Sequence, residues 1–223
     1  MIYLSFINIE DISWPMISMK LSALSNQEES RILQLKNTKH RIQRLCARLL
    51  LCYMLKRFFN NRISQPCLID YDKFGKPFLC NNVGVDDVAI AHSNNIVLCA
   101  ISTEDKIGVD VEFVRDYCIH DFYSILSEKE IKYFENETIN VCKEFVRIWT
   151  LKESITKTIG KGLSYDFSLI DTTRLLNENS IFLDDTIFHI HPLEIDDRYV
   201  CFLTSKQPIN ENLLILRLFI DQL

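Results

Sequence analysis

The stretch RIWTLKESITKTIGKGL, residues 147–163, reads as the end of a helix that Gly160 closes. One stripe of this helix would carry charged and polar side chains beside a tryptophan: Trp149, Lys152, Glu153, Thr156 and Lys157. A second stripe is apolar and can pack into a core: Ile148, Leu151, Ile155 and Ile159. Because Glu153 and Lys157 are separated by one helical turn, they lie on the same face. Taken alone, this pair is either a surface ion pair or one part of a charged site.

A second short stretch, KIGVDVEFV at residues 106–114, reads as a strand. Side chains alternate between the two faces of a strand, so Val109 and Val111 share one face, which we expect to be the core. Asp110 and Glu112 share the other face. Two neighbouring carboxylates repel each other unless a cation or a proton lies between them, and their oxygens suit Mg²⁺. The alternative is an exposed strand with two unrelated acids.

The composition is that of a globular protein. The chain has 223 residues, 48% of them apolar and 25% charged, enough for one large domain or two small fused ones. No apolar run reaches the roughly 18 residues that a membrane-spanning helix needs. Without a run of that length we expect no membrane contact. The start, MIYLSFINIEDISW, lacks a basic segment and reads as a strand rather than a signal peptide. The eight cysteines form no CxxC pair, so we expect buried thiols in a reducing cytoplasm.

Charge is distributed unevenly along the chain, whose net charge is −5. From Ser30 to Ile69 there is no aspartate or glutamate, whereas basic residues recur: Arg31, Lys36, Lys39, Arg41, Arg44, Arg48, Lys56, Arg57 and Arg62. A basic segment in an acidic protein indicates a local anionic ligand rather than bulk binding of nucleic acid. The alternative is a solvated helix face.

Helix and strand patterns alternate in the first half of the chain. The sequence SNQE at residues 25–28 fits a capping box, so we expect a helical segment, one helix or two, from there to about Phe58. Residues 65–84 look irregular, with a turn at residues 74–77. Runs rich in valine and isoleucine predict strands at 87–91, 96–102 and 107–112.

The second half shows the same mixture. The sequence SEKE at residues 127–130 fits another capping box, which predicts a helix through Phe134, and a further helix covers about 141–159. Strand patterns return near 181–191, 198–204 and 213–220. The class is therefore α+β, with halves at residues 1–103 and 104–223, and the alternation leaves parallel and antiparallel pairing open.

The two charged stretches belong to one ordered set of motifs. FGKP (74–77) and AIAHS (89–93) are followed by GVDVE (108–112) and, about forty residues later, by WTLKESITKTIGKGL (149–163). In these four motifs the chain resembles the Sfp-type 4′-phosphopantetheinyl transferases over most of its length. It departs from them at Ala91, because the family usually has a serine immediately before the histidine. One hydroxyl contact to a phosphate is therefore expected to be missing.

The resemblance implies a pseudo-dimeric α+β fold of two similar halves, each a small sheet packed with helices, with coenzyme A bound between them. It implies an Mg²⁺-dependent enzyme, with Mn²⁺ also possible, that transfers the 4′-phosphopantetheine group of coenzyme A to a serine of an apo acyl or peptidyl carrier protein and releases 3′,5′-ADP. The carrier can belong to a peptide synthetase, a polyketide synthase or a fatty-acid pathway. By analogy with the larger branch of the family, we expect a monomer that serves secondary metabolism.

The resemblance also assigns residues by position. The metal ligands would be Asp110, Glu112 and Glu153. Catalysis falls to Glu153 as general base and to Lys157, which would also contact the phosphates. The other contacts to coenzyme A are assigned to Arg44, Lys76 and His92.

Two other functions compete with this interpretation. A metal-dependent nuclease usually places a lysine two residues after the second acid, whereas here Phe113 and Val114 follow Glu112, so the pattern does not fit. The second alternative is a non-catalytic nucleotide- or carrier-protein-binding module of the same fold. Two further alternatives stay open: His92 can be a core histidine, and the aromatic segment 113–126 can be a carrier contact or an ordinary packing element.

Overall fold

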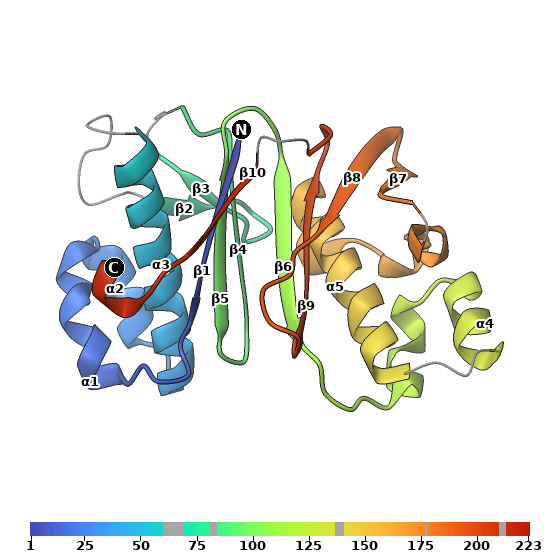
Figure 1. Cartoon of the computed structure of the whole chain (residues 1–223), viewed down its shortest axis with the longest axis horizontal. Helices are drawn as coiled ribbons and strands as arrows, with labels where there is room; N and C mark the ends of the chain where they lie inside the picture. Colours follow the sequence, from blue (N-terminus) through green and yellow to red (C-terminus); the bar gives the residue numbers. More distant parts are fainter. Residues whose placement is uncertain (60–68, 81–83, 137–140, 177, 210–212) are drawn as a thin grey trace.

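The computed structural model describes residues 1–59, 69–80, 84–136, 141–176, 178–209 and 213–223. Two four-stranded sheets stand against each other in the middle, and each carries a long helix on its outer side (Figure 1). Helix α3 (Thr38–Phe59) covers the N-terminal sheet, and α5 (Val141–Ile159) covers the C-terminal sheet. This arrangement confirms the α+β class that the sequence predicts.

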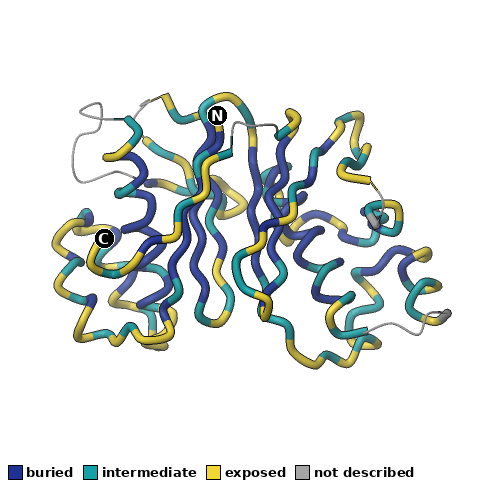
Figure 2. Tube along the Cα trace, viewed as in Figure 1, coloured by how far each residue is buried: buried dark blue, intermediate teal, exposed yellow. Residues whose placement is uncertain are grey.

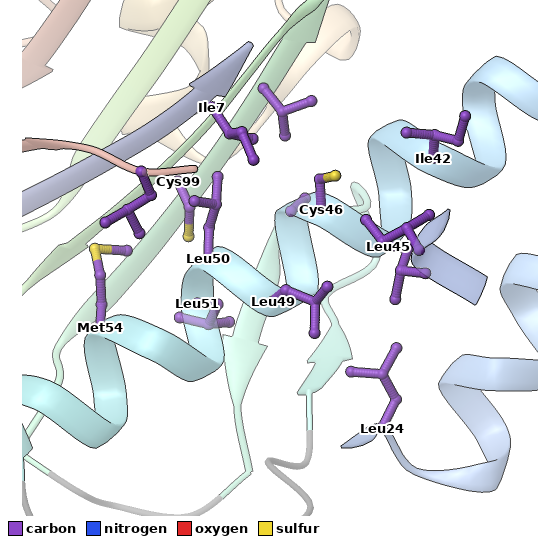
Figure 3. Packing of buried hydrophobic residues seen from close by; sticks show 14 of the residues in the cluster. Ile7, Leu24, Ile42, Leu45, Cys46, Leu49, Leu50, Leu51, Met54 and Cys99 are labelled. Carbon is purple, nitrogen blue, oxygen red and sulfur yellow. The ribbon is translucent and has the colours of Figure 1, made fainter. Parts of the chain in front are cut away.

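The N-terminal sheet has the strand order β10-β1-β5-β4, formed by β1 (Ile2–Asn8), β4 (Asp87–Ser93), β5 (Ile96–Ser102) and β10 (Leu213–Arg217). The pairs β1–β5 and β5–β4 are antiparallel, whereas β1 and β10 are parallel. Ile7 of β1 and Cys99 of β5 pack against Leu50 and Met54 of α3 (Figure 3). This apolar layer holds α3 on the sheet.

Short helices lead into α3: α1 (Trp14–Ile17), a 3₁₀ helix (Ser18–Ala23) and α2 (Asn26–Leu33). Ser25 caps α2, because its hydroxyl oxygen accepts the N–H of Glu28 at 3.3 Å. The side-chain oxygen of Asn37 caps α3 by accepting the N–H groups of Lys39 and His40 at 2.8 and 3.3 Å. The segment that the sequence left as one helix or two is therefore two helices.

The expectation of an irregular segment at 65–84 is wrong where the structure describes it. Strands β2 (Ile69–Tyr71) and β3 (Pro77–Leu79) pair as a small antiparallel hairpin, while residues 65–68 and 81–83 lie outside the described residues. Three-residue strands carry too little alternation to be detected in a sequence. The predicted turn is confirmed, since Gly75 has φ 86° and its N–H donates to the Asp72 carbonyl at 3.0 Å.

The C-terminal sheet has the strand order β6-β9-β8-β7, formed by β6 (Ile107–Phe113), β7 (Ser180–Leu183), β8 (Thr186–Pro192) and β9 (Tyr199–Ser205). All of its pairs are antiparallel. The strand region predicted near 181–191 is a hairpin that turns at Asp184 and Asp185, with φ values of 49° and 55°. A two-residue turn with positive φ is typical of tight hairpins, and aspartate tolerates this conformation.

The helices of the second half follow the predicted limits. At the start of α4 (Glu128–Asn136), the Ser127 hydroxyl accepts the N–H of Glu130 at 3.2 Å, and the Glu130 carboxylate accepts the N–H of Ser127 at 2.8 Å. The capping box is therefore complete. Helix α5 ends at Gly160, whose φ is 85° and whose N–H donates to the Thr156 carbonyl at 3.0 Å. Short 3₁₀ helices connect these elements: Ile119–Ile125, Gly162–Ser164, Phe167–Leu169 and Thr173–Leu176.

A shared apolar layer joins the two sheets. Leu4 and Ala91 of the N-terminal sheet are buried in one cluster with Val109 and Val111 of β6, which confirms the predicted core face of that strand. The central strands are accordingly the most continuously buried part of the chain (Figure 2). Strand β10 crosses back and pairs with β1, so a late segment of the chain completes the N-terminal sheet.

The tail differs from expectation in one detail. Strand β10 ends at Arg217, and residues Ile220–Gln222 form a 3₁₀ helix where the sequence predicted that the strand continues to residue 220. Among the described residues, no helix combines the length and apolarity needed to cross a membrane. Among the cysteines that the structure describes, Cys46, Cys99 and Cys201 are buried, whereas Cys80 and Cys118 are exposed, so the expectation of buried thiols holds for only part of them.

Candidate active site

Helix α5 lies directly on strand β6, and Gly108 makes this close approach possible. A Cβ atom at position 108 would lie 2.0 Å from the Ser154 carbonyl oxygen and 2.6 Å from the Thr158 nitrogen. Since strand side chains alternate, Gly108 shares its face with Asp110 and Glu112. The missing side chain therefore lets the end of α5 come down over the two acids.

The ammonium group of Lys157 lies among the carboxylates. Its nitrogen is 2.6 Å from Asp110 Oδ1 and 3.9 Å from Glu153 Oε2. Glu112 is bonded to the neighbouring strand, since its Oε2 accepts a hydrogen bond of 2.7 Å from the Ser93 hydroxyl of β4. Ser93 also accepts the backbone N–H of Phe113 at 3.1 Å, so the ends of β4 and β6 are tied together beside the acids.

Burial and the neighbouring charges shift the pKa values of the groups in this cluster. Burial raises the pKa of Asp110 to about 7, with Glu153 and Glu112 adding to the rise and Lys157 opposing it. Burial also raises the pKa of Glu153, against the effect of Lys157. Burial alone would lower the pKa of Lys157, but Asp110 and Glu153 outweigh it and the pKa is raised. The ammonium therefore stays charged and balances part of the negative charge.

The donor set of the cluster fits a hard cation. Oδ2 of Asp110 is buried and has no hydrogen-bond partner, although a buried carboxylate oxygen normally has one. The oxygens of Asp110, Glu112 and Glu153 are ligands of the type that Mg²⁺ prefers. Within the described part of the chain, however, no three His, Cys, Asp or Glu side chains already stand as a metal-binding group. The side chains would therefore have to move for all three acids to share one ion.

Two clefts meet at this cluster. The first, of about 350 Å³, is lined by basic and aromatic residues of the N-terminal half and by the acids: Arg44, Ala47, Arg48, Tyr71, Gly75, Pro77, Ile90, Ala91, His92, Asp110, Glu112, Glu153 and Lys157. The second, of about 260 Å³, is more apolar and runs between the β2–β3 turn, with Phe74, and the segment after α5, with Leu163. Glu153 and Lys157 line both clefts.

The structure places Arg44 and His92 on the wall of the first cleft. Arg44 lies over the ring of Tyr71, with its guanidinium carbon 6.0 Å from the ring centroid. His92 is exposed on β4, which disfavours the interpretation as a core histidine. Desolvation within the crowded cleft and the nearby charge of Lys157 lower its pKa. The guanidinium groups of Arg44 and Arg48 give the first cleft its positive charge, and His92 adds an imidazole.

Sequence reasoning missed Arg48, Tyr71 and Ser93 as parts of this site. Arg48 belongs to the basic segment, but its burial and its ion pair with the buried Glu28 of α2 depend on tertiary packing. It also donates to the Tyr71 hydroxyl. A signal for Ser93 did exist, since it follows His92 directly in the AIAHS motif.

Lys152 does not line either cleft, so the charged stripe expected on α5 is wrong at this position. Its side chain is fully buried and donates to Glu130, at 2.5 Å, and to the carbonyls of Ile125 and Phe167, at 2.9 and 3.0 Å. Trp149 packs beside Phe167, with ring centroids 5.4 Å apart. The lysine therefore stabilises the contact between α5 and its neighbours.

The aromatic segment 113–126 is mostly a packing element in the structure. Tyr117 and Phe122 are half-buried and lie against Phe145 of α5, with ring centroids 5.3 and 4.8 Å from it. These contacts favour the packing alternative over an exposed aromatic surface. None of its phenylalanine or tyrosine side chains is exposed, and its exposed residues are Arg115, Asp116, Cys118, His120, Asp121 and Ser124.

A basic cleft that ends in a buried carboxylate cluster defines a site for a phosphate-containing ligand and a bound cation. Comparison with known proteins gives the family. Residues 106–204 match the model of the 4′-phosphopantetheinyl transferase superfamily. This range contains β6 and α5, the two elements that carry the acids and Lys157.

Relatives of known name agree with this match. The chain is 26% identical to the L-aminoadipate-semialdehyde dehydrogenase-phosphopantetheinyl transferase of Candida glabrata over 183 residues, which cover 76% of this chain and 69% of the relative. It is 27% identical to the 4′-phosphopantetheinyl transferase gsp of Aneurinibacillus migulanus, covering 73% and 68%. A Saccharomyces cerevisiae relative with the same name as that of Candida glabrata is 32% identical, covering 64% and 55%.

Over residues 106–204 the chain is similar to the 4′-phosphopantetheinyl transferase superfamily, and the named relatives extend this similarity over about three quarters of its length. It is a transferase, and its activity is the transfer of phosphopantetheine to carrier proteins. Coenzyme A is the substrate that the family implies.

Proposed function

We propose that this transferase moves the 4′-phosphopantetheine group of coenzyme A to a serine of an apo acyl or peptidyl carrier protein and releases 3′,5′-ADP. The observation that carries the proposal is the place of Glu153 and Lys157, which lie where a basic cleft and a more apolar cleft meet. A reacting phosphate bound there would contact both charged groups. The first cleft is lined by basic residues, among them Arg44 and Arg48, which could bind the phosphates in the nucleotide part of the substrate.

Asp110, Glu112 and Glu153 are the residues that would hold Mg²⁺, or Mn²⁺ in its place. When bound, the ion would neutralise charge on the pyrophosphate oxygens during transfer. The support from this chain is the buried Oδ2 of Asp110 without a hydrogen-bond partner, and the pKa of Asp110, which burial raises first and the neighbouring Glu153 and Glu112 raise further. Lys157 supplies part of the required positive charge from the protein itself.

Glu153 is the proposed general base. A serine hydroxyl is a weak nucleophile until a positioned group accepts its proton. The raised pKa of Glu153 suits such a group, because it brings proton affinity closer to neutral pH. Its side chain is 12% exposed, so it remains accessible from the clefts although it is packed on β6.

Lys157, Arg44 and His92 are the proposed contacts to the phosphates of coenzyme A. All three line the first cleft, and Lys157 is in contact with Asp110. Coenzyme A carries a pyrophosphate and a further phosphate on its ribose, so it offers an anionic partner for more than one of these groups. Charge-assisted hydrogen bonds of this kind are stronger than neutral ones.

We further propose that the two halves, 1–103 and 104–223, are structurally related as a pseudo-dimer, with β10 exchanged into the first sheet. In each half a strand leads through a long helix to a hairpin, and the last strand of the hairpin pairs with the first strand. The sequence β1, α3, β4, β5 corresponds in this way to β6, α5, β8, β9. The site then lies between the halves of one chain, which is consistent with a monomer.

The proposal also includes the cellular compartment of the enzyme and the pathway of its carrier protein. Buried cysteine thiols such as Cys46 and Cys201 favour a reducing cytoplasm. By analogy with the larger branch of the family, the carrier belongs to secondary metabolism. A panel of apo carriers from peptide synthetases, polyketide synthases and fatty-acid pathways would compare their rates directly.

One assay tests the proposed function against a binding-only module. Coenzyme A, Mg²⁺ and the apo carrier are incubated with the protein, and the carrier is measured by mass spectrometry. Transfer adds one phosphopantetheine to the serine and releases an equal amount of 3′,5′-ADP. Binding of coenzyme A with no mass increase in any carrier would contradict the proposal and leave the non-catalytic alternative.

A further inference from the structure

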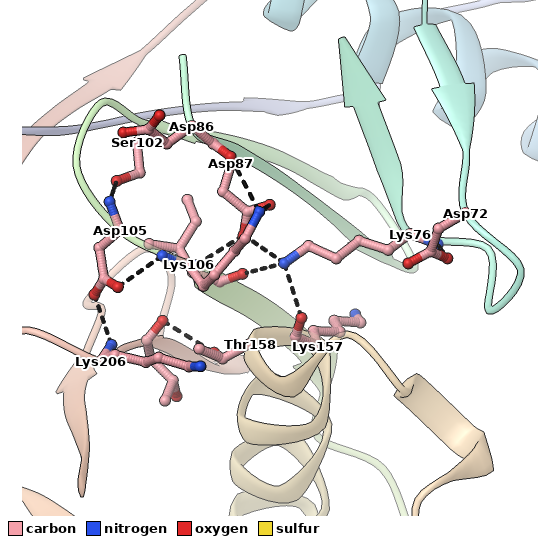
Figure 4. Close-up of polar contacts among 12 residues, drawn as sticks. Asp72, Lys76, Asp86, Asp87, Ser102, Asp105, Lys106, Lys157, Thr158 and Lys206 are labelled. Carbon is pink, nitrogen blue, oxygen red and sulfur yellow. Dashed lines mark hydrogen bonds and ion pairs between the residues drawn. The ribbon is translucent and has the colours of Figure 1, made fainter. Parts of the chain in front are cut away.

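The side chain of Lys76 points into the protein rather than into the first cleft. Lys76 sits at the end of the turn between β2 and β3, and its ammonium donates to the Asp87 carboxylate and to the carbonyl oxygens of Ile107 and Lys157 (Figure 4). The two carbonyl distances are both 3.0 Å. The three acceptors come from β4, β6 and α5, so one group connects three elements.

These contacts use all the donors of the lysine. An ammonium group has three N–H bonds and no acceptor, and each of the three has an intramolecular partner here. The side chain is 14% exposed. A phosphate in the cleft could bind Lys76 only if one of these contacts were broken. The resemblance assigned Lys76 to the phosphates, and the geometry favours another role.

The carbonyl of Lys157 belongs to the last turn of α5, where it accepts the N–H of Gly160 at 3.2 Å as well as the ammonium of Lys76. A cation at this end also interacts favourably with the helix dipole. Asp87 joins the same arrangement from β4, because its Oδ2 accepts the N–H of Ile107 at 2.9 Å. The lysine thus fixes the end of the helix that carries Glu153 and Lys157 relative to the strand that carries Asp110.

We infer that Lys76 is a positioning residue for the transfer reaction, which ties the end of α5 to β4 and β6 and thereby sets the distance between Lys157 and Asp110. The inference rests on the proposed function, since it concerns the same site. Displacement of a catalytic group by about 1 Å can cost about 10²-fold in rate. Loss of the three contacts of the Lys76 ammonium should therefore slow transfer without removing a contact to coenzyme A.

The test compares Lys76→Met with Lys76→Arg and with Lys73→Met. Methionine keeps the length of the side chain and removes all three donors. Arginine keeps the charge but has a planar donor fork that does not match three acceptors in this arrangement. Lys73 is an exposed lysine of the same turn, so its variant is the matched control. For each variant, kcat, KM and the Kd of coenzyme A by calorimetry are measured.

The expected result is a fall in kcat of about 10- to 100-fold in Lys76→Met, with a change in Kd of less than about threefold. Lys76→Arg should also lose kcat and keep its affinity, and Lys73→Met should resemble the wild type. A phosphate ligand would behave in the opposite way: Lys76→Met would weaken coenzyme A binding about tenfold or more, and Lys76→Arg would retain it. That pattern, or wild-type kcat in a folded Lys76→Met, would overturn the inference.

A second measurement does not depend on activity. Hydrogen exchange of the amides that close α5, at Gly160 and Lys161, should be faster in Lys76→Met than in Lys73→Met. Asp87→Asn serves if Lys76→Met does not fold, and it should cause the same faster exchange and loss of kcat. Unchanged exchange at Gly160 and Lys161 would contradict the inference that Lys76 fixes the end of α5. An inactive wild type would remove the proposed function, but the exchange result would still decide whether Lys76 holds the helix.

Discussion

The ammonium nitrogen of Lys157 lies 2.6 Å from Oδ1 of Asp110, and this contact joins the last turns of α5 to the middle of β6 across 47 positions of sequence. It is a buried contact, with the Asp110 side chain 6% exposed. The lysine partly satisfies a carboxylate that is also repelled by Glu112 and Glu153. Lys157 therefore offsets part of the negative charge of the three acids, and it also lines the ligand cleft.

Glu153→Gln should lower turnover by about 10²- to 10⁴-fold, because the amide keeps the shape of the side chain but cannot accept a proton. Coenzyme A binding should weaken less than turnover. Steady-state rates and calorimetry measure the two effects separately. Glu144→Gln, in an ion pair with Arg147 on the same helix, is the control and should leave both unchanged. Equal rates in Glu153→Gln and the wild type would leave Glu153 without a role as base.

Lys157→Ala should weaken coenzyme A binding and slow transfer together, because it removes positive charge from the phosphate cleft. It also leaves Asp110 without its counter-charge, so the pKa of that carboxyl should rise above about 7. Calorimetry and kinetics on the same preparation measure both effects. A loss of turnover with unchanged affinity would assign Lys157 to the chemical step alone.

Asp110→Ala and Glu112→Ala should each abolish transfer and leave the fold intact. Removing one of several close carboxylates relieves repulsion, which offsets the loss of the contact to Lys157 or Ser93. Mn²⁺ should substitute for Mg²⁺, whereas Ca²⁺ should support little activity, because it prefers longer distances and more ligands. Asp116→Ala, at an exposed position nearby, is the control. Full activity after thorough chelation would rule out the metal site.

Gly108→Ala should destabilise the protein and displace α5. The new Cβ would lie 2.0 Å from the Ser154 carbonyl oxygen. This oxygen belongs to the backbone of a helix, which cannot move aside as the end of a flexible side chain can. Overpacking of this kind costs about 1–3 kcal/mol or more. Urea unfolding measures the loss in stability, and turnover of the folded fraction should fall as well. Wild-type stability would mean that α5 does not rest on β6 as closely as described.

Lys152→Met should lower the free energy of unfolding by about 3–5 kcal/mol, since it leaves Glu130 as an uncompensated buried charge. The double variant Lys152→Met with Glu130→Gln should recover part of this loss. Coenzyme A affinity of the folded variant should stay within about threefold of the wild type, because Lys152 lines neither cleft. A selective loss of affinity would instead support the original assignment of Lys152 to the charged stripe.

Glu28 should contribute to stability in a pH-dependent way. Burial raises the pKa of its carboxyl, but Arg48 and Arg31 outweigh this effect and the pKa lies below the usual 4.5. A lowered folded-state pKa means that the contribution is fully present above pH 4.5 and is lost as the pH falls through the folded-state value. Glu28→Gln should remove this part of the acid sensitivity, measured by urea unfolding from about pH 6 to pH 3.

The control for this prediction is Glu29→Gln, the next residue of the same helix. It should keep the wild-type dependence of stability on pH. If Glu28→Gln and the wild type lost stability in parallel below pH 4.5, the ion pair with Arg48 would not be the source of the effect.

The sequence by itself determined the elements with strong local signals. Capping at Ser25 and Ser127 depends on residues three positions apart, and closure of α5 depends on Gly160, so local patterns were sufficient. The runs rich in valine and isoleucine at 96–102 and 107–112 indicated their strands equally clearly. The hairpin at 69–79 was missed, because its strands are too short to show a period.

For the candidate site, the motifs identified the family and the residues to examine, and β6 and α5 indeed bring Asp110, Glu153 and Lys157 together. The roles of the other two lysines could not be predicted in this way. Lys76 and Lys152 stand in charged motifs, yet both direct their ammonium groups into the protein. A pattern fixes which face of an element a residue occupies, whereas its partner comes from another element.

Only the tertiary structure decided three matters: the pairing of β10 with β1, the burial of Lys152 and the meeting of two clefts at Glu153. Each depends on contacts between residues far apart in the chain. Helix caps and strand alternation arise from backbone geometry over a few residues, so the sequence states them directly. Burial and pKa depend on which elements pack together, and that is settled by the free energy of the whole fold.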